Sequence, residues 1–115
     1  MAAEGNLSID VSREGDRAVL RLDGELDLAS VPQFEDAVVS LSTDDAPATI
    51  VLDLRRLEFI DSTGLRAILS QDKRSAERGQ TFALVRGSEQ VQRLMQMTRV
   101  DEHLRIIASP EEILL

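Results

Sequence analysis

The segment TIVLDL, residues 49–54, constrains the fold of this 115-residue chain more than any other stretch. It is an almost continuous apolar run with several β-branched side chains, and only Asp53 interrupts it. Such a run is typical of an inner strand covered on both faces, whereas a strand with one wet face alternates apolar and polar residues. Because a buried carboxylate is costly unless it is hydrogen-bonded, we expect Asp53 to lie near the carboxyl end of this strand and to accept backbone N–H groups there.

The N-terminal region predicts a β-hairpin at the edge of the same sheet. Residues 6–11 and 17–23 alternate apolar with polar side chains, and the turn between them contains Gly15. This alternation indicates two strands that share one buried face. The next residues, 24–30, are expected to form a loop, with the carboxylates of Asp23 and Glu25 in solvent.

Strands and helices alternate after the hairpin, which predicts a single α/β domain over residues 1–115. The sheet should be mixed but mostly parallel, with the helices packed on it, and the helices that follow Ser30 and Ser62 should lie on one face. Ser30 and Gln33 have the spacing of a capping box. Residues 1–5 are expected to be a disordered N-terminus. The other expected elements are a helix from Ser30 to about Leu41, the strand 49–54, a helix from Ser62 to Arg78 that ends at Gly79, a strand at 81–85, a helix at 87–97, a strand at 104–107 and a C-terminal helix at 109–115.

The composition argues against several classes of function. The net charge is −8 and the chain has neither Trp nor Tyr, so it lacks the clustered cations and stacking side chains that nucleic-acid binding needs. There is no Cys, and the single histidine, His103, is expected at the surface, so we expect no metal site. No glycine-rich phosphate loop points to a nucleotide, and we expect no cofactor. The N-terminus has no signal-peptide pattern and no apolar run approaches membrane-spanning length, so we expect a cytoplasmic protein that does not contact a membrane.

The segment EFIDSTGLRAIL, residues 58–69, places an acid, two hydroxyls and a glycine between a strand and a helix. Asp61 or Ser62 can cap the helix, and one cap is enough, so a hydroxyl is left over. Gly64 early in a helix costs about 1 kcal/mol relative to alanine, which suggests that another molecule approaches closely there. An exposed hydroxyl at a helix N-terminus is also a suitable phosphate acceptor, because the free N–H groups and the helix dipole tolerate an added anion.

The order of elements and two segments resemble the STAS domains of bacterial anti-sigma factor antagonists. The segments are GELDLASVPQF at 24–34 and IVLDLRRLEFIDSTGL at 50–65, and the likeness covers nearly the whole chain. The resemblance implies that Ser62 is the phosphoacceptor, with Thr63 as the less favoured alternative. The partner-binding residues that it implies are Asp27, Asp61, Ser62, Thr63 and Gly64.

The resemblance also implies a set of partners. The unphosphorylated form would bind and sequester an anti-sigma factor, itself a serine kinase of the GHKL ATP-binding type, and so release a sigma factor. Phosphorylation at Ser62 would end this binding, and a metal-dependent serine phosphatase would restore it. The chain would act as a monomer or weak dimer and would not itself be an enzyme.

Two other classes of function stay open at the level of the residues. One is a STAS accessory module without phosphorylation, in a membrane lipid transporter or a stress-signalling scaffold. The intact Asp61 to Gly64 segment favours the switch, because an accessory module needs no acceptor serine. The other is a small enzyme, against which the lack of a nucleophile–base pair argues. Met95 and Met97 are expected to fill packing gaps rather than to bind a partner.

Overall fold

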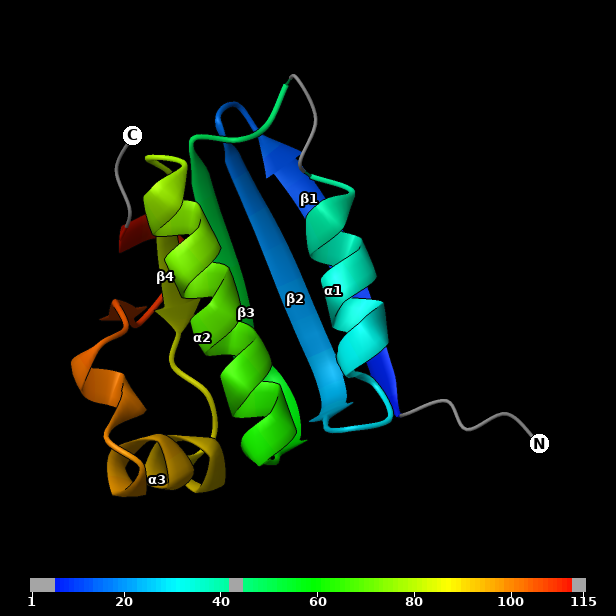
Figure 1. Ribbon diagram of the computed structural model, residues 1–115, viewed down its shortest axis with the longest axis vertical. Helices are drawn as coiled ribbons and strands as arrows, with labels where there is room; N and C mark the ends of the chain where they lie inside the picture. Colours follow the sequence, from blue (N-terminus) through cyan, green and yellow to red (C-terminus); the bar gives the residue numbers. More distant parts are fainter. Residues whose placement is uncertain (1–5, 42–44, 113–115) are drawn as a thin grey trace.

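A mixed sheet with the strand order β1-β2-β3-β4-β5 organises the computed structural model, which describes residues 6–41 and 45–112 (Figure 1). The hairpin strands β1 (Leu7–Glu14) and β2 (Arg17–Leu26) are antiparallel. The strands β3 (Thr49–Ile60), β4 (Thr81–Val85) and β5 (Ile106–Ile107) continue the sheet in parallel from β2. The hairpin therefore stands at one edge and β3 in the middle, which confirms both predictions. The disorder expected at residues 1–5 lies outside the described residues.

The helices α1 (Val31–Val39) and α2 (Ser62–Glu77) cover the same face of the sheet, as predicted (Figure 1). α2 ends at the expected place, since Arg78 is its C-terminal cap and Gly79 adopts a φ of 69°. α3 (Glu89–Met97) packs against β3 near its carboxyl end. A short 3₁₀ helix at Val100–Glu102 then leads toward β5.

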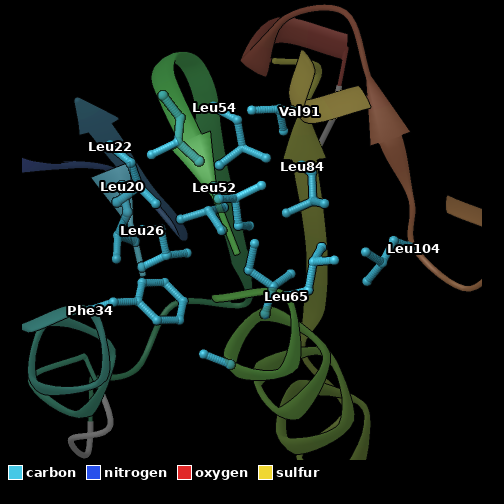
Figure 2. Packing of buried hydrophobic residues seen from close by; sticks show 14 of the residues in the cluster. Leu20, Leu22, Leu26, Phe34, Leu52, Leu54, Leu65, Leu84, Val91 and Leu104 are labelled. Carbon is cyan, nitrogen blue, oxygen red and sulfur yellow. The ribbon is translucent and has the colours of Figure 1, made fainter. Parts of the chain in front are cut away.

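The core has two layers because the inner strands are covered on both faces. The C-terminal segment returns over the face opposite the helices, where Arg17 Nη1 donates to the carbonyl oxygen of the buried Pro110 at 2.8 Å. A small cluster lies on that face, formed by Val19, Val51, Ala83, Val85 and Ile107. The larger cluster, on the helix side, includes Leu20, Leu22, Leu26, Phe34, Leu52, Leu54, Leu65 and Leu84 (Figure 2).

β2 is longer than predicted, because residues 24–26 belong to the strand and not to a loop. The pairing with β3 shifts register here, and Gly24 adopts a φ of 115°. A Cβ at Gly24 would lie 2.0 Å from the carbonyl oxygen of Asn6, so only glycine lets the N-terminal segment pass this close. The glycine that indicated a loop therefore marks an irregular place within a strand.

The C-terminal helix predicted at 109–115 is a single 3₁₀ turn in its described part, Pro110–Glu112. The carboxylate of Glu112 accepts the backbone N–H of Ser109 at 3.0 Å and also that of Ala108. This is one half of a capping box, in which the acid bonds back to the start of the turn. Residues 113–115 lie outside the described part of the chain.

Candidate functional site

The carboxyl ends of β2 and β3 meet at one end of the sheet, where α2 begins (Figure 1). Asp61 lies between β3 and α2 and is the N-cap residue. Its Oδ1 accepts the N–H of Gly64 at 2.9 Å, and its Oδ2 accepts the N–H of Leu28 at 3.2 Å. Its own N–H donates to the carbonyl oxygen of Leu26 at 3.2 Å. Asp61 thus fulfils the predicted capping role and also joins the start of α2 to the loop that follows β2.

Ser62 is exposed at the first position of α2. Asp61 already caps the helix, and the Ser62 hydroxyl has no hydrogen-bond partner among the described residues. Thr63, the next residue, is half-buried. Of these neighbouring hydroxyls, Ser62 is therefore the more accessible to another protein.

Gly64 is buried, and the close approach that it permits is internal to the domain. A Cβ at this position would lie 2.5 Å from the carbonyl oxygen of Leu26 and 2.9 Å from Cγ1 of Ile60. The glycine thus lets the first turn of α2 rest directly on the ends of β2 and β3. The sequence analysis expected another molecule to approach closely at Gly64. This expectation is wrong, because the space that the missing side chain leaves is occupied by Leu26 and Ile60 of the same domain.

Asp27 shapes the loop between β2 and α1. Its Oδ1 accepts the N–H groups of Ala29 and Ser30 at 3.1 and 3.2 Å, an arrangement typical of an Asx turn. The Ser30 hydroxyl donates to the carbonyl oxygen of Glu25 at 2.8 Å, and Gln33 bonds to β1 through Leu7. The capping box predicted for Ser30 and Gln33 is therefore absent, because both side chains hold neighbouring strands instead.

Large apolar side chains are exposed around this end of the sheet. Leu28 is 73% exposed, Phe59 49% and Met97 74%. Phe59 and Met97 line a groove between β3 and α3, together with Ile60, whose side chain lies next to Gly64. We call Leu28, Phe59 and Met97 the apolar frame of Ser62. The prediction that Met97 fills a packing gap is wrong, whereas Met95 is buried as expected.

The sequence contained a signal for the apolar frame. Phe59 and Ile60 are consecutive in a strand, where neighbouring side chains point to opposite faces, so both could not enter one core. Leu28 follows Asp27 in a short polar loop that offers no apolar surface of its own. Neither signal predicts that these side chains come to the same end of the sheet as Ser62, because that depends on the packing of β2, β3 and α3.

A comparison with models of known protein families identifies the family to which this chain belongs. The model of the STAS domain matches residues 8–113. The chain belongs to the STAS domain family. The anti-sigma-F factor antagonist RsfB of Mycobacterium tuberculosis is 25% identical over 114 residues, covering 99% of this chain and 92% of that protein. The anti-sigma-B factor antagonist of Bacillus subtilis is 27% identical over 106 residues, covering 92% and 95%.

A solved structure with the same fold agrees with this assignment. The crystal structure of a putative anti-sigma factor antagonist from Thermotoga maritima superposes with a TM-score of 0.82 at 27% identity, covering 90% of this chain and 89% of that one. The predicted fold class, a single α/β domain with a mixed, mostly parallel sheet, an N-terminal hairpin and helices packed on the sheet, is therefore confirmed.

The described part of this STAS domain contains neither a metal-binding cluster nor a membrane-spanning helix. Within residues 6–41 and 45–112, no group of three or more His, Asp or Glu side chains is placed to hold a metal ion. No helix within those same ranges is long and apolar enough to cross a membrane. His103 is exposed, as expected.

Asp53 forms a polar cluster on the face opposite the helices. It lies in the middle of β3, not near its end as predicted, because the strand continues to Ile60. The carboxylate is buried and accepts the N–H of Arg55 at 3.0 Å and its guanidinium at 2.7 Å, while Arg21 lies 4.0 Å away. Burial raises the pKa of Asp53, but the hydrogen bonds from Arg55 and the charges of Arg55 and Arg21 outweigh it and hold this pKa below its ordinary value. These arginines already have carboxylate partners, so the cluster stabilises the sheet and offers no free site.

Replacing Arg55 by glutamine should lower the free energy of unfolding by about 2 kcal/mol at neutral pH, because the buried carboxylate loses its charged donor. A carboxyl whose folded-state pKa is depressed stabilises the protein above its unfolded-state pKa, and this contribution is lost as the pH falls. The difference in the free energy of unfolding between the wild type and Arg55→Gln should therefore become smaller below about pH 4.

Urea unfolding at neutral and acidic pH measures this difference. Arg56→Gln is the matched control, because Arg56 is the next residue, is 80% exposed and lies 3.7 Å from the exposed Asp23. It should change stability by less than about 0.5 kcal/mol. An equal loss in both variants would contradict the assigned role of Asp53 and Arg55.

Proposed function

We propose that this STAS domain is an anti-sigma factor antagonist whose unphosphorylated form binds an anti-sigma factor through the surface around Ser62. The observation that carries the proposal is the exposed Ser62 hydroxyl, which has no partner among the described residues and lies at the same end of the sheet as the apolar frame. Apolar side chains exposed around a polar centre are typical of a protein-binding surface. The names of the relatives, both anti-sigma factor antagonists, support the same kind of partner.

Phosphorylation of Ser62 is the proposed switch, and the anti-sigma factor is the proposed kinase, of the GHKL type. The terminal phosphoryl group of ATP held by the kinase passes to Ser62 Oγ. A new P–O bond forms to Oγ, the bond to the β-phosphate oxygen breaks and ADP leaves, while a base of the kinase takes the hydroxyl proton. A metal-dependent serine phosphatase would return Ser62 to its free form by hydrolysis. These steps would take place in the cytoplasm, where sigma factors act.

The surrounding residues suit a switch that acts at the surface. Asp61 holds the first turn of α2 to the loop after β2 without using the Ser62 hydroxyl. A phosphate on Ser62 therefore breaks none of the hydrogen bonds that fix this end of the sheet. Asp27 and Asp61 contribute to binding mainly by holding the backbone in place, because their carboxylates are engaged with N–H groups of the domain.

Phosphate incorporation tests the acceptor residue. With an anti-sigma factor kinase and labelled ATP, the wild type should accept one phosphate, and Ser62→Ala should accept less than about a hundredth as much, because its hydroxyl is gone. Thr63→Val is the matched control: it removes the adjacent, half-buried hydroxyl and should leave incorporation nearly unchanged. Incorporation that survives in Ser62→Ala and is lost in Thr63→Val would assign the acceptor to Thr63.

The accessory-module alternative makes a different prediction in the same assay. A STAS module of a lipid transporter or scaffold needs no acceptor serine, so no kinase encoded near it would label the wild type. Binding of such a module to its partner would also be the same for wild type and Ser62→Ala.

A further inference from the structure

Arg66 lies one helical turn after Ser62 on the exposed face of α2. Residues four apart on a helix are neighbours, and helical side chains lean toward the N-terminus. The guanidinium of Arg66 can therefore reach the space next to the Ser62 hydroxyl. An acid that precedes a base by four residues is the favourable order for an ion pair on a helix.

Arg66 has no acidic partner within the described residues. It makes no hydrogen bond or ion pair with any described residue. The residues three and four positions away on its helix are Ser62, Thr63, Leu69 and Ser70, none of which is acidic. Asp61, the nearest acid along the helix, already accepts the N–H groups of Gly64 and Leu28.

We propose that Arg66 is the internal counter-ion of phosphorylated Ser62, an inference that rests on the proposed phosphorylation. A planar guanidinium donates two parallel hydrogen bonds to phosphate oxygens, and these charge-assisted bonds are stronger than neutral ones. Phosphorylation then changes the surface twice. It adds an anion at position 62. It also pairs Arg66 with that anion on the same helix, so the guanidinium can no longer contact an acidic group of the anti-sigma factor.

The pairing is measured on protein that carries phosphoserine at position 62 from synthesis, so no kinase is needed. The second ionisation of the phosphate is followed by ³¹P NMR in the wild type, Arg66→Gln, Arg66→Lys and Lys73→Gln. Loss of the guanidinium should raise the phosphate pKa by about 0.2 to 0.4, which corresponds to the strength of an exposed ion pair four residues apart on a helix. Arg66→Lys should give an intermediate phosphate pKa, because the ammonium group keeps the positive charge but cannot donate two parallel hydrogen bonds as the planar guanidinium does.

Lys73→Gln is the control because Lys73 is an exposed cation on the same helix, well beyond reach of Ser62. It should leave the phosphate pKa unchanged. The acids on neighbouring elements, Glu58 and Asp27, and the cap Asp61 raise the same pKa in every variant, so the difference between variants isolates Arg66. Circular dichroism checks that each variant is folded.

An equal phosphate pKa in wild type and Arg66→Gln would overturn the pairing. An equal rise in Arg66→Gln and Lys73→Gln would overturn it too, because the effect would then follow net charge and not a contact. The titration involves no anti-sigma factor, so its outcome is independent of whether phosphorylation changes binding. The proposed function fails instead if the anti-sigma factor binds both forms equally.

Discussion

Replacing Phe59 by alanine should weaken binding of the anti-sigma factor about 30-fold, a loss of about 2 kcal/mol. Phe59 is half exposed, and it lines the groove with Ile60 and Met97 beside the start of α2. Partly exposed aromatic side chains next to a groove are where binding energy concentrates in protein interfaces. The substitution leaves the net charge unchanged, so the loss would report apolar contact. Isothermal titration calorimetry with the unphosphorylated protein measures it.

The control for this prediction is Val39→Ala. Val39 is 61% exposed, but it ends α1 at the opposite end of the molecule from the start of α2 (Figure 1). It should bind as the wild type does. Met97→Ala, at a side chain that is 74% exposed, provides a second test with little risk to folding and should also weaken binding. If Phe59→Ala, Met97→Ala and the control all bind like the wild type, the apolar frame does not contact the partner.

The parts of the fold that follow from local pattern could be predicted from the sequence. The apolar run at 49–54 placed β3 inside the sheet, and the alternation before it placed the hairpin at an edge. The extension of β2 could not be predicted, because Gly24 is required by a backbone contact with Asn6 that no local pattern contains. Asp53 was placed near the end of its strand because the apolar run stops at residue 54, whereas β3 continues to Ile60.

The candidate site was predictable in its residues but not in their roles. The cap at Asp61 and the surplus hydroxyl at Ser62 follow from helix chemistry and are both present in the structure. Gly64 was assigned to an outside contact because its cost is visible in the sequence, whereas the carbonyl oxygen of Leu26 that requires it is not. The apolar frame joins residues from the β2–α1 loop, β3 and α3, so it needed the folded chain.

Phosphorylation of Ser62 should lower the affinity for the anti-sigma factor by roughly 100-fold or more, about 3 kcal/mol, because a complex would bring the phosphate into a largely dehydrated interface. The added group carries about −1.5 to −2 charge at neutral pH. It would lie next to Asp61, at the end of the sheet where the apolar side chains of Leu28 and Phe59 are exposed, and such side chains offer an anion no hydrogen bonds. The fold should survive, because the helix N-terminus tolerates an anion and the bonds of Asp61 remain.

Substitutions at Ser62 should follow the same order. Ser62→Ala should bind like the unmodified protein. The hydroxyl makes no hydrogen bond within the described residues, so its removal should not destabilise the fold. Ser62→Asp should bind with intermediate affinity, because one carboxylate has less charge and fewer acceptor oxygens than a phosphate.

The most direct test compares the calorimetric affinity of the anti-sigma factor for the unmodified protein and for protein with phosphoserine at position 62, with a circular dichroism spectrum of each. We expect the affinity to fall by roughly two orders of magnitude while the spectra stay the same. Equal affinities of the two forms would contradict the account, and so would a loss of affinity that is accompanied by a loss of helical signal, because the switch would then act by unfolding and not by charge at a fixed surface.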